Sequence, residues 1–147
     1  MPILSGQIVT AGQLTRLQPK TYDAAGTGNI VGSGVTDVDV PGATITITTE
    51  TAGAVCVVET TFDYDFTGGT TTLGAGRLVV DGTGESRYAL FQQGPGSSAD
   101  RVTAGQTYRT VLGAAGSHTL KLVATVPTNM NLIGAYTSLV ATVYEVV

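Results

Sequence analysis

The strongest constraint on the fold is the run from Ala54 to Phe66, in which residues of similar polarity recur at every second position. A period of two is the side-chain period of a β-strand, and one polar face is typical of an antiparallel sheet with one side in water. We therefore predict an antiparallel strand over residues 54–66 with its acidic face in solvent. The largely apolar face carries Ala54, Cys56, Val58, Thr60, Phe62, Tyr64 and Phe66, and the opposite face, beyond Val55 and Val57, carries Glu59, Thr61, Asp63 and Asp65.

Shorter runs of the same kind, separated by Gly-rich turns, continue to the end of the chain. Residues 44–49 alternate Ile with Thr, and residues 117–126 alternate in the same way. Further short strands are expected at 77–81, 87–92, 101–112 and 138–147. About eight such strands predict an all-β protein, an antiparallel jelly roll or β-sandwich that occupies residues 30–147.

Residues 1–29 lack this alternation and are predicted to form an arm with one short helix at 11–18. Thr10 and Gln13 fit a capping box, in which each side chain bonds the backbone N–H of the other residue. A helix this short is not stable alone in water. It therefore needs a surface to pack against, which is either its own β-domain or a neighbouring subunit. We predict that the arm docks on neighbouring subunits through its apolar residues, which are Ile3, Ile8, Val9, Leu14 and Leu17.

The composition favours assembly over catalysis or nucleic-acid binding. Charged residues make up 12% of the chain, about half the usual share, and the mean hydropathy is +0.24. No run of about eighteen apolar residues is present, as a membrane helix would need, so a surface buried against other subunits explains the hydropathy better. The net charge of −4 argues against nucleic-acid binding, which requires clustered positive charge.

The residues that carry chemistry form no recognisable catalytic or metal-binding arrangement. His118 is the only histidine, and no G-x-S-x-G nucleophile elbow accompanies it, so we expect a hydrogen bond at a strand end or a subunit contact. Cys56 lies on an apolar face, where cysteine behaves as a small hydrophobe, either in the core or at a subunit interface. Asp63 and Asp65 lack the spacing of an EF-hand loop. We expect no enzyme activity, no metal and no cofactor.

Two segments resemble known protein families. The sequence GSHTLKL at 116–122, with the closing run LVATVYEV at 139–146, resembles the last hairpin of tumour-necrosis-factor-like jelly rolls. The sequence GQIVTAGQLTRLQP at 6–19 resembles the opening of small virion proteins from actinobacterial tailed phages, of the head-decoration or minor-tail type. The first resemblance implies a homotrimer with the last hairpin at its centre, and the second implies a location on the surface of the phage particle.

These resemblances lead to two functional expectations. The first is a structural virion protein, a decoration or cement subunit that binds the major capsid or tail subunits. The second is a receptor- or glycan-binding head of a tail tip, with contacts made by polar loops such as 92–100; the lack of Trp favours the first. We expect no nucleic-acid or membrane partner. Candidates for the homotrimer interface, which parity alone does not separate from core residues, are Phe62, Tyr64, His118, Leu120, Leu122 and Tyr144.

Overall fold

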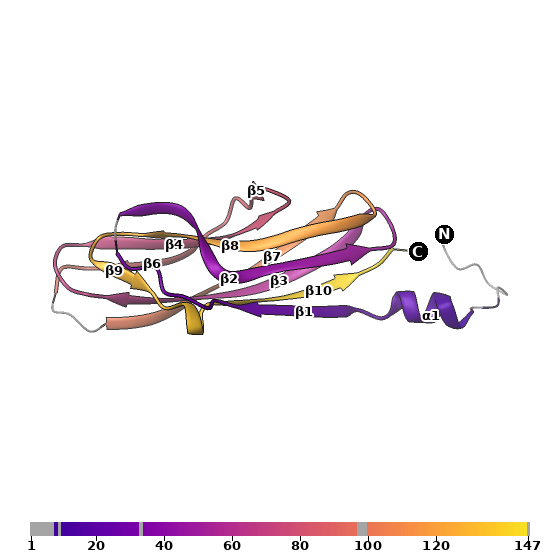
Figure 1. Ribbon diagram of the computed structural model, residues 1–147, viewed down its shortest axis with the longest axis horizontal. Coiled ribbons are helices and arrows are strands. Elements are labelled where there is room, and N and C mark those ends of the chain that lie inside the picture. Colours follow the sequence, from indigo (N-terminus) through magenta and orange to yellow (C-terminus); the bar gives the residue numbers. More distant parts are fainter. Residues whose placement is uncertain (1–7, 9, 33, 97–99, 147) are drawn as a thin grey trace.

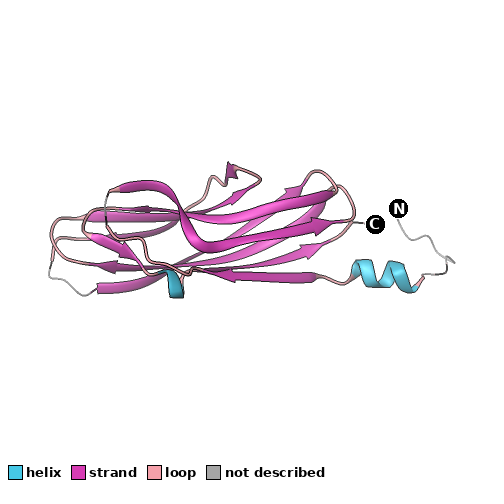
Figure 2. Ribbon diagram, viewed as in Figure 1, coloured by secondary structure: helices cyan, strands magenta, loops and turns pink. Residues whose placement is uncertain are grey.

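The computed structural model consists of two antiparallel β-sheets packed face to face, with one short helix beyond one end (Figure 1). Figure 2 shows that strands make up nearly all of the body, so the predicted all-β class is confirmed. The structure describes Ile8 and residues 10–32, 34–96 and 100–146. The elements are α1 Ala11–Leu17, β1 Lys20–Ala25, β2 Val35–Thr49, β3 Ala54–Phe66, β4 Thr72–Val80, β5 Thr83–Gly84, β6 Ala89–Gln93, β7 Asp100–Leu112, β8 Gly116–Val126, β9 Met130–Leu132, the 3₁₀ turn η1 Gly134–Tyr136 and β10 Ser138–Tyr144.

The strand order is that of a jelly roll. One sheet has the order β1-β10-β3-β7, with β9 also paired to β3, and the other has the order β2-β8-β4-β5, with β6 also paired to β4. Most successive long strands therefore alternate between the two sheets, as in a double-sheet jelly roll. The predicted jelly roll is confirmed, and the strands beyond the expected eight are the two-residue β5 and the three-residue β9.

The core lies between the two sheets and is built from the alternating faces seen in the sequence. The inward side chains of β3 and β8 are fully or almost fully buried. The ring of Phe62 lies 6.5 Å from that of Tyr64, which lies 6.1 Å from that of Phe91. Opposite these rings β4 carries glycine, and a Cβ atom on Gly76 would lie 2.3 Å from Cδ1 of Phe62. Glycine therefore leaves the space that the aromatic rings fill.

The β-domain begins earlier than the sequence predicts. Strand β1 lies within the segment predicted as arm and pairs with β10 from Lys20 opposite Val143 to Ala25 opposite Ser138. Its inward residues Tyr22 and Ala24 pack against the core. The boundary expected at residue 29 is therefore wrong, because six residues with only two apolar inward positions show too little alternation to indicate a strand. The arm proper ends before Lys20.

Candidate functional site

Helix α1 has the predicted capping box. The backbone N–H of Gln13 donates to Oγ1 of Thr10 at 3.3 Å, and the backbone N–H of Thr10 donates to Oε1 of Gln13 at 2.9 Å. The helix ends at Leu17, and Gln18 has an extended backbone because the following Pro19 disfavours helical geometry at the residue before it. These contacts fix both ends of a seven-residue helix.

The apolar side chains of the arm are exposed. Leu14 is 55% and Leu17 41% exposed, and Ile8 is 89% exposed. Figure 1 shows α1 extending past the end of the sandwich, so the β-domain does not bury the two leucines. The other two predicted docking residues, Ile3 and Val9, lie outside the described residues. Of the two surfaces considered for this helix, its own β-domain is therefore not the one that covers it.

Four of the six predicted interface residues belong to the core of the subunit. Phe62, Tyr64, Leu120 and Leu122 have no exposed surface, because their strands turn these faces toward the opposite sheet. Another subunit has no access to them, and their prediction as interface residues is wrong. The core and a subunit interface both select apolar residues at alternate positions, so alternation alone does not distinguish the two.

His118 makes hydrogen bonds at the start of β8. A hydrogen bond at a strand end was one of the two roles expected for it. Its Nδ1 lies 2.6 Å from Oδ2 of Asp81 and its Nε2 lies 3.0 Å from the carbonyl oxygen of Ala114. Both ring nitrogens face acceptors, so the protonated ring donates to both, and the hydrogen bond to Asp81 raises the pKa of His118. The residue is 6% exposed, and its ring binds Asp81 in the turn after β4. It does not lie on a surface open to another subunit.

Tyr144 is the predicted interface residue that does lie on the surface, at 45% exposed. It stands opposite Val55 on β3, which stands opposite Val111 on β7, and directly paired residues share one face of a sheet. Val57 and Val140 lie on the same outer face, and Val111 is 55% exposed. We call these five residues the outer apolar patch. It lies at the end of the sheet from which the arm leaves, since Lys20 pairs with Val143.

Asp63 is not on a solvated acidic face as the sequence predicts. Its carboxylate is buried, and both of its oxygens lie 3.0 Å from Nε of Arg101. The guanidinium of Arg101 lies over the ring of Tyr136 at 4.5 Å from the ring centroid. A buried carboxylate requires a paired cation, and a residue 38 positions away supplies it. Proximity of this kind leaves no pattern in the sequence.

Cys56 is part of the core. It has no exposed surface, and burial raises the pKa of its thiol to about 11. Of the two places expected for Cys56, it therefore lies in the core and not at a subunit interface. Over the described ranges, no three His, Cys, Asp or Glu side chains gather closely enough to hold a metal ion. In the same part of the chain, no helix has the length and apolar character needed to cross a membrane.

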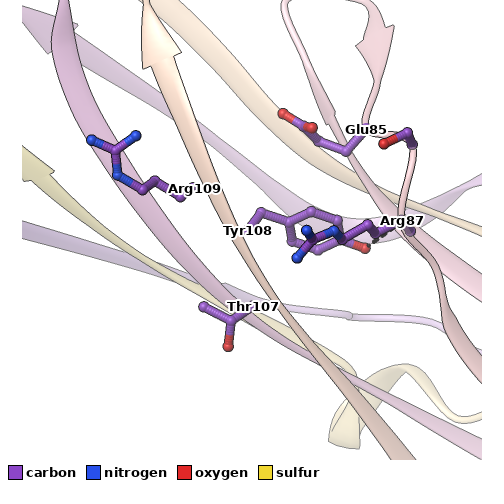
Figure 3. Close-up of a pocket in the computed structure, with 6 residues that line it drawn as sticks. Glu85, Arg87, Thr107, Tyr108 and Arg109 are labelled. Atoms are coloured by element: carbon purple, nitrogen blue, oxygen red, sulfur yellow. Dashed lines mark hydrogen bonds between the residues drawn. The ribbon is translucent and has the colours of Figure 1, made fainter.

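A polar pocket of about 210 Å³ lies at the edge of the sandwich, between the segment that follows β5 and the edge strand β7 (Figure 3). The hydroxyl of Tyr108 donates to the carbonyl oxygen of Arg87 at 3.1 Å, and the backbone N–H of Glu85 donates to the carbonyl oxygen of Leu78 on β4 at 2.8 Å. The first bond joins the two walls of the pocket, and the second joins the wall at residues 85–87 to β4. The lining residues are Glu85, Ser86, Arg87, Thr107, Tyr108 and Arg109.

Two arginines of the pocket differ from the other basic side chains that the structure describes. Arg87 and Arg109 make no side-chain hydrogen bond or ion pair with any described residue. Sequence reasoning did not single them out, because they are far apart along the chain and no motif links them. The described basic side chains that do pair with carboxylates are Lys20 with Glu50, Arg77 with Asp37, Arg101 with Asp63 and Lys121 with Asp39.

The comparisons with known proteins bear on the fold. No protein-family model and no curated protein matches the chain. The solved structure of Eiger TNF from S. frugiperda is similar, with a TM-score of 0.51, 12% identity, and coverage of 87% of this chain and 93% of that one. Latent PorU from Porphyromonas gingivalis matches with a TM-score of 0.48 and 12% identity over 86% of this chain and 13% of that one. The first similarity confirms the tumour-necrosis-factor-like jelly roll, and at this identity it concerns the fold alone.

Proposed function

We propose that this protein is a structural virion protein, a decoration subunit that attaches to the capsid or tail surface of a phage particle through α1. One observation carries the proposal: a capped helix extends beyond the sandwich with Leu14 and Leu17 exposed. A helix of this length is marginal in water without a packing surface. Exposed leucines on such a helix therefore favour a role in docking on another subunit.

One arm alone would bind weakly. Burial of a leucine contributes about 1.5–3 kcal/mol, so the two leucines together contribute about 3–6 kcal/mol before the cost of ordering the arm. A complex with a micromolar dissociation constant requires about 8 kcal/mol. Several arms must therefore act together, and linked copies of the chain gain this through multivalency.

A homotrimer built on the outer apolar patch would supply those copies. Tyr144, Val111 and Val140 are the exposed members of this patch, and they take the place of the core residues Phe62 and Leu120 as interface candidates. Apolar surface gathered on one face of a sheet is typical of a subunit contact. Because the patch lies where the arm leaves the domain, the arms of an assembly built on it would emerge at one end.

Binding to stripped particles tests the attachment. The double variant Leu14→Ser/Leu17→Ser should fold with an unchanged melting temperature, because both side chains are exposed, and should no longer rebind phage particles from which the protein has been removed. The matched control is Leu73→Ser/Leu90→Ser, which removes two leucines exposed at 45% and 57% on the other sheet. Loss of binding in the control variant, or full binding by the arm variant, would exclude the arm as the attachment site.

Sedimentation tests the trimer separately. The wild-type chain should sediment as a trimer at micromolar concentration, and Val111→Asp/Tyr144→Asp should sediment as a folded monomer because it places charge in the patch. A wild-type monomer that also fails to assemble on particles would refute the homotrimer.

The second expectation, a receptor- or glycan-binding head, is supported by a different observation, the polar pocket with two unpaired arginines. The pocket does not involve the arm, so one subunit can carry both functions. The arm is nevertheless the feature that the virion proposal explains and that a binding head does not require.

A further inference from the structure

We propose that Glu145 is a positioning residue for the attachment arm. Its carboxylate holds the turn at residues 50–51, this turn and β10 together hold the root of the arm at Lys20, and α1 therefore leaves the domain in a fixed direction. The use of that direction in docking rests on the proposed function, whereas the contacts themselves belong to the isolated chain.

The carboxylate of Glu145 is held at both of its oxygens. Oε1 accepts the backbone N–H of Glu50 at 2.9 Å, and Oε2 accepts the backbone N–H of Thr51 at 3.1 Å and the Thr51 hydroxyl at 2.7 Å. Glu145 is only 8% exposed. Burial alone would raise the pKa of this carboxyl group, but the bonds from Glu50 and Thr51 hold the pKa below its ordinary value. The fold therefore favours the ionised, hydrogen-bonded form.

This contact joins β10, β1 and the turn after β2 at the end of the sandwich where the arm begins. Glu145 follows directly after β10, and residues 50–51 follow directly after β2, so one side chain ties together strand ends from the two sheets. β10 also carries β1, because Val143 pairs with Lys20. Lys20 reaches the same turn, since its Nζ lies 3.4 Å from Oε1 of Glu50. The root of the arm is therefore held from β10 and from the turn at once.

Most of this hold comes from Glu145. The side chains of Lys20 and Glu50 are 38% and 52% exposed, and exposed ion pairs contribute little to stability. Hydrogen bonds to an ionised acceptor are stronger than bonds between neutral groups, and Glu145 accepts three of them. Loss of its charge should therefore release the turn, the end of β10 and the pairing of Lys20 with β10.

The link between the root and α1 is short and stiff. Only Gln18 and Pro19 separate Leu17, the last residue of α1, from Lys20. The ring of Pro19 restricts its backbone angle φ, and the backbone N–H of Gln18 donates to the carbonyl oxygen of Thr15 at 3.3 Å. A fixed root thus gives α1 one direction, beyond the end of the sandwich (Figure 1). A preset direction lowers the ordering cost when several arms dock together.

Distances between two spin labels test the hold on the arm. The labels are attached to Thr15→Cys in α1 and Thr103→Cys on β7, which are both exposed positions, and the native Cys56 has no exposed surface for labelling. Dilution with unlabelled chain restricts the measurement to distances within one subunit. The distance distribution should be narrow in the doubly labelled chain and should broaden when Glu145→Gln is added.

Hydrogen exchange of the same variant locates the effect. The hydrogen-bonded amides of β1 should exchange about tenfold or more faster in Glu145→Gln, as expected when bonds to a charged acceptor are lost. Thr51→Val removes one of the three bonds and should have a smaller effect. The control Glu85→Gln makes the same chemical change in the pocket beside β7, at the opposite edge of the sandwich from β1, and it should change neither measurement.

The proposal is overturned if the folded variants Glu145→Gln and Thr51→Val both keep the narrow distance distribution and the slow exchange of β1. A lower melting temperature without broadening would give Glu145 a purely structural role and would also overturn it, as would equal broadening in Glu85→Gln.

Rebinding to stripped particles tests the use of the fixed direction. Glu145→Gln should rebind more weakly than the wild type, and equal rebinding by a variant whose arm has been freed would overturn the proposal. The proposed function fails in a different way: full rebinding by Leu14→Ser/Leu17→Ser would exclude the arm as the attachment site and would leave the distance and exchange results for Glu145 unaffected.

Discussion

Replacement of Phe62 by Ala tests whether this residue belongs to the core of one subunit. The side chain has no exposed surface, and its ring is 6.5 Å from the ring of Tyr64. Gly76 faces it from β4, so no side chain there can move into the space left by the ring. Phe→Ala changes in cores cost about 3–5 kcal/mol, and the cost rises with the cavity that remains. We expect about 4–5 kcal/mol for Phe62→Ala.

For a chain of this size, each 1 kcal/mol corresponds to about 2–4 °C, so the melting temperature should fall by about 8–20 °C. Urea unfolding at two protein concentrations, with sedimentation of the same samples, measures the effect and locates it. If Phe62 is in the core, the unfolding midpoint falls while the oligomeric state is that of the wild type. The control Val140→Ala, on the outer apolar patch, should cost about 1 kcal/mol or less.

The result that would refute this reasoning is specific. If Phe62→Ala left the midpoint of the dissociated chain unchanged and weakened only the association of subunits, Phe62 would be an interface residue after all. A subunit interface makes apparent stability depend on protein concentration, whereas a defect in the core lowers the stability of each chain at any concentration.

Three further outcomes follow from contacts described above. The hydrogen bond to Asp81 raises the pKa of His118 above its usual value of 6.5. The stabilisation that this bond gives the fold is therefore complete below pH 6.5 and is lost as the pH rises through the raised pKa. Urea unfolding between about pH 5.5 and 8.5 should show this loss in the wild type and not in His118→Gln. Asp63→Asn removes the partner of Arg101 and should lower the free energy of unfolding by about 1–3 kcal/mol, whereas Asp65→Asn should have little effect. Gly76→Ala should cost about 1–3 kcal/mol by overpacking and less than that in a Phe62→Leu background, as a double-mutant cycle would measure.

The parts of the fold that the sequence predicts are those with long alternation. Strands β3 and β8 have 13 and 11 residues, and their inward faces are recognisable because many positions agree. Strand β1 has only six residues, so too few positions agree for the sequence to indicate a strand. In β2 the pairing with β8 shifts register between Asp39 and Thr44, around Pro41 and Gly42, and only the regular part after this irregularity was predicted.

The candidate sites divide in the same way. The capped helix depends on residues three or four positions apart, so its cap and the shared face of its two leucines are visible in the sequence, whereas the exposure of that face is not. The pairing of Asp63 with Arg101 and the placement of Arg87 and Arg109 around one pocket depend on which segments become neighbours, and local patterns do not encode this. Alternation also tells which residues point together but not what covers them, which is why Phe62 and Tyr64 were candidates for the core and for an interface alike.

The attachment of the arm through β1 has a mechanical consequence. The arm enters the domain at Lys20, and β1 is an edge strand joined to β10 along its whole length. Hydrogen bonds between antiparallel strands are perpendicular to the strands, so tension applied along the arm loads the bonds of this pairing in shear, all at once. Tension applied sideways at the arm would instead peel β1 from β10 one bond at a time. A subunit anchored by this arm therefore resists a pull along its long axis (Figure 1) better than a pull across it.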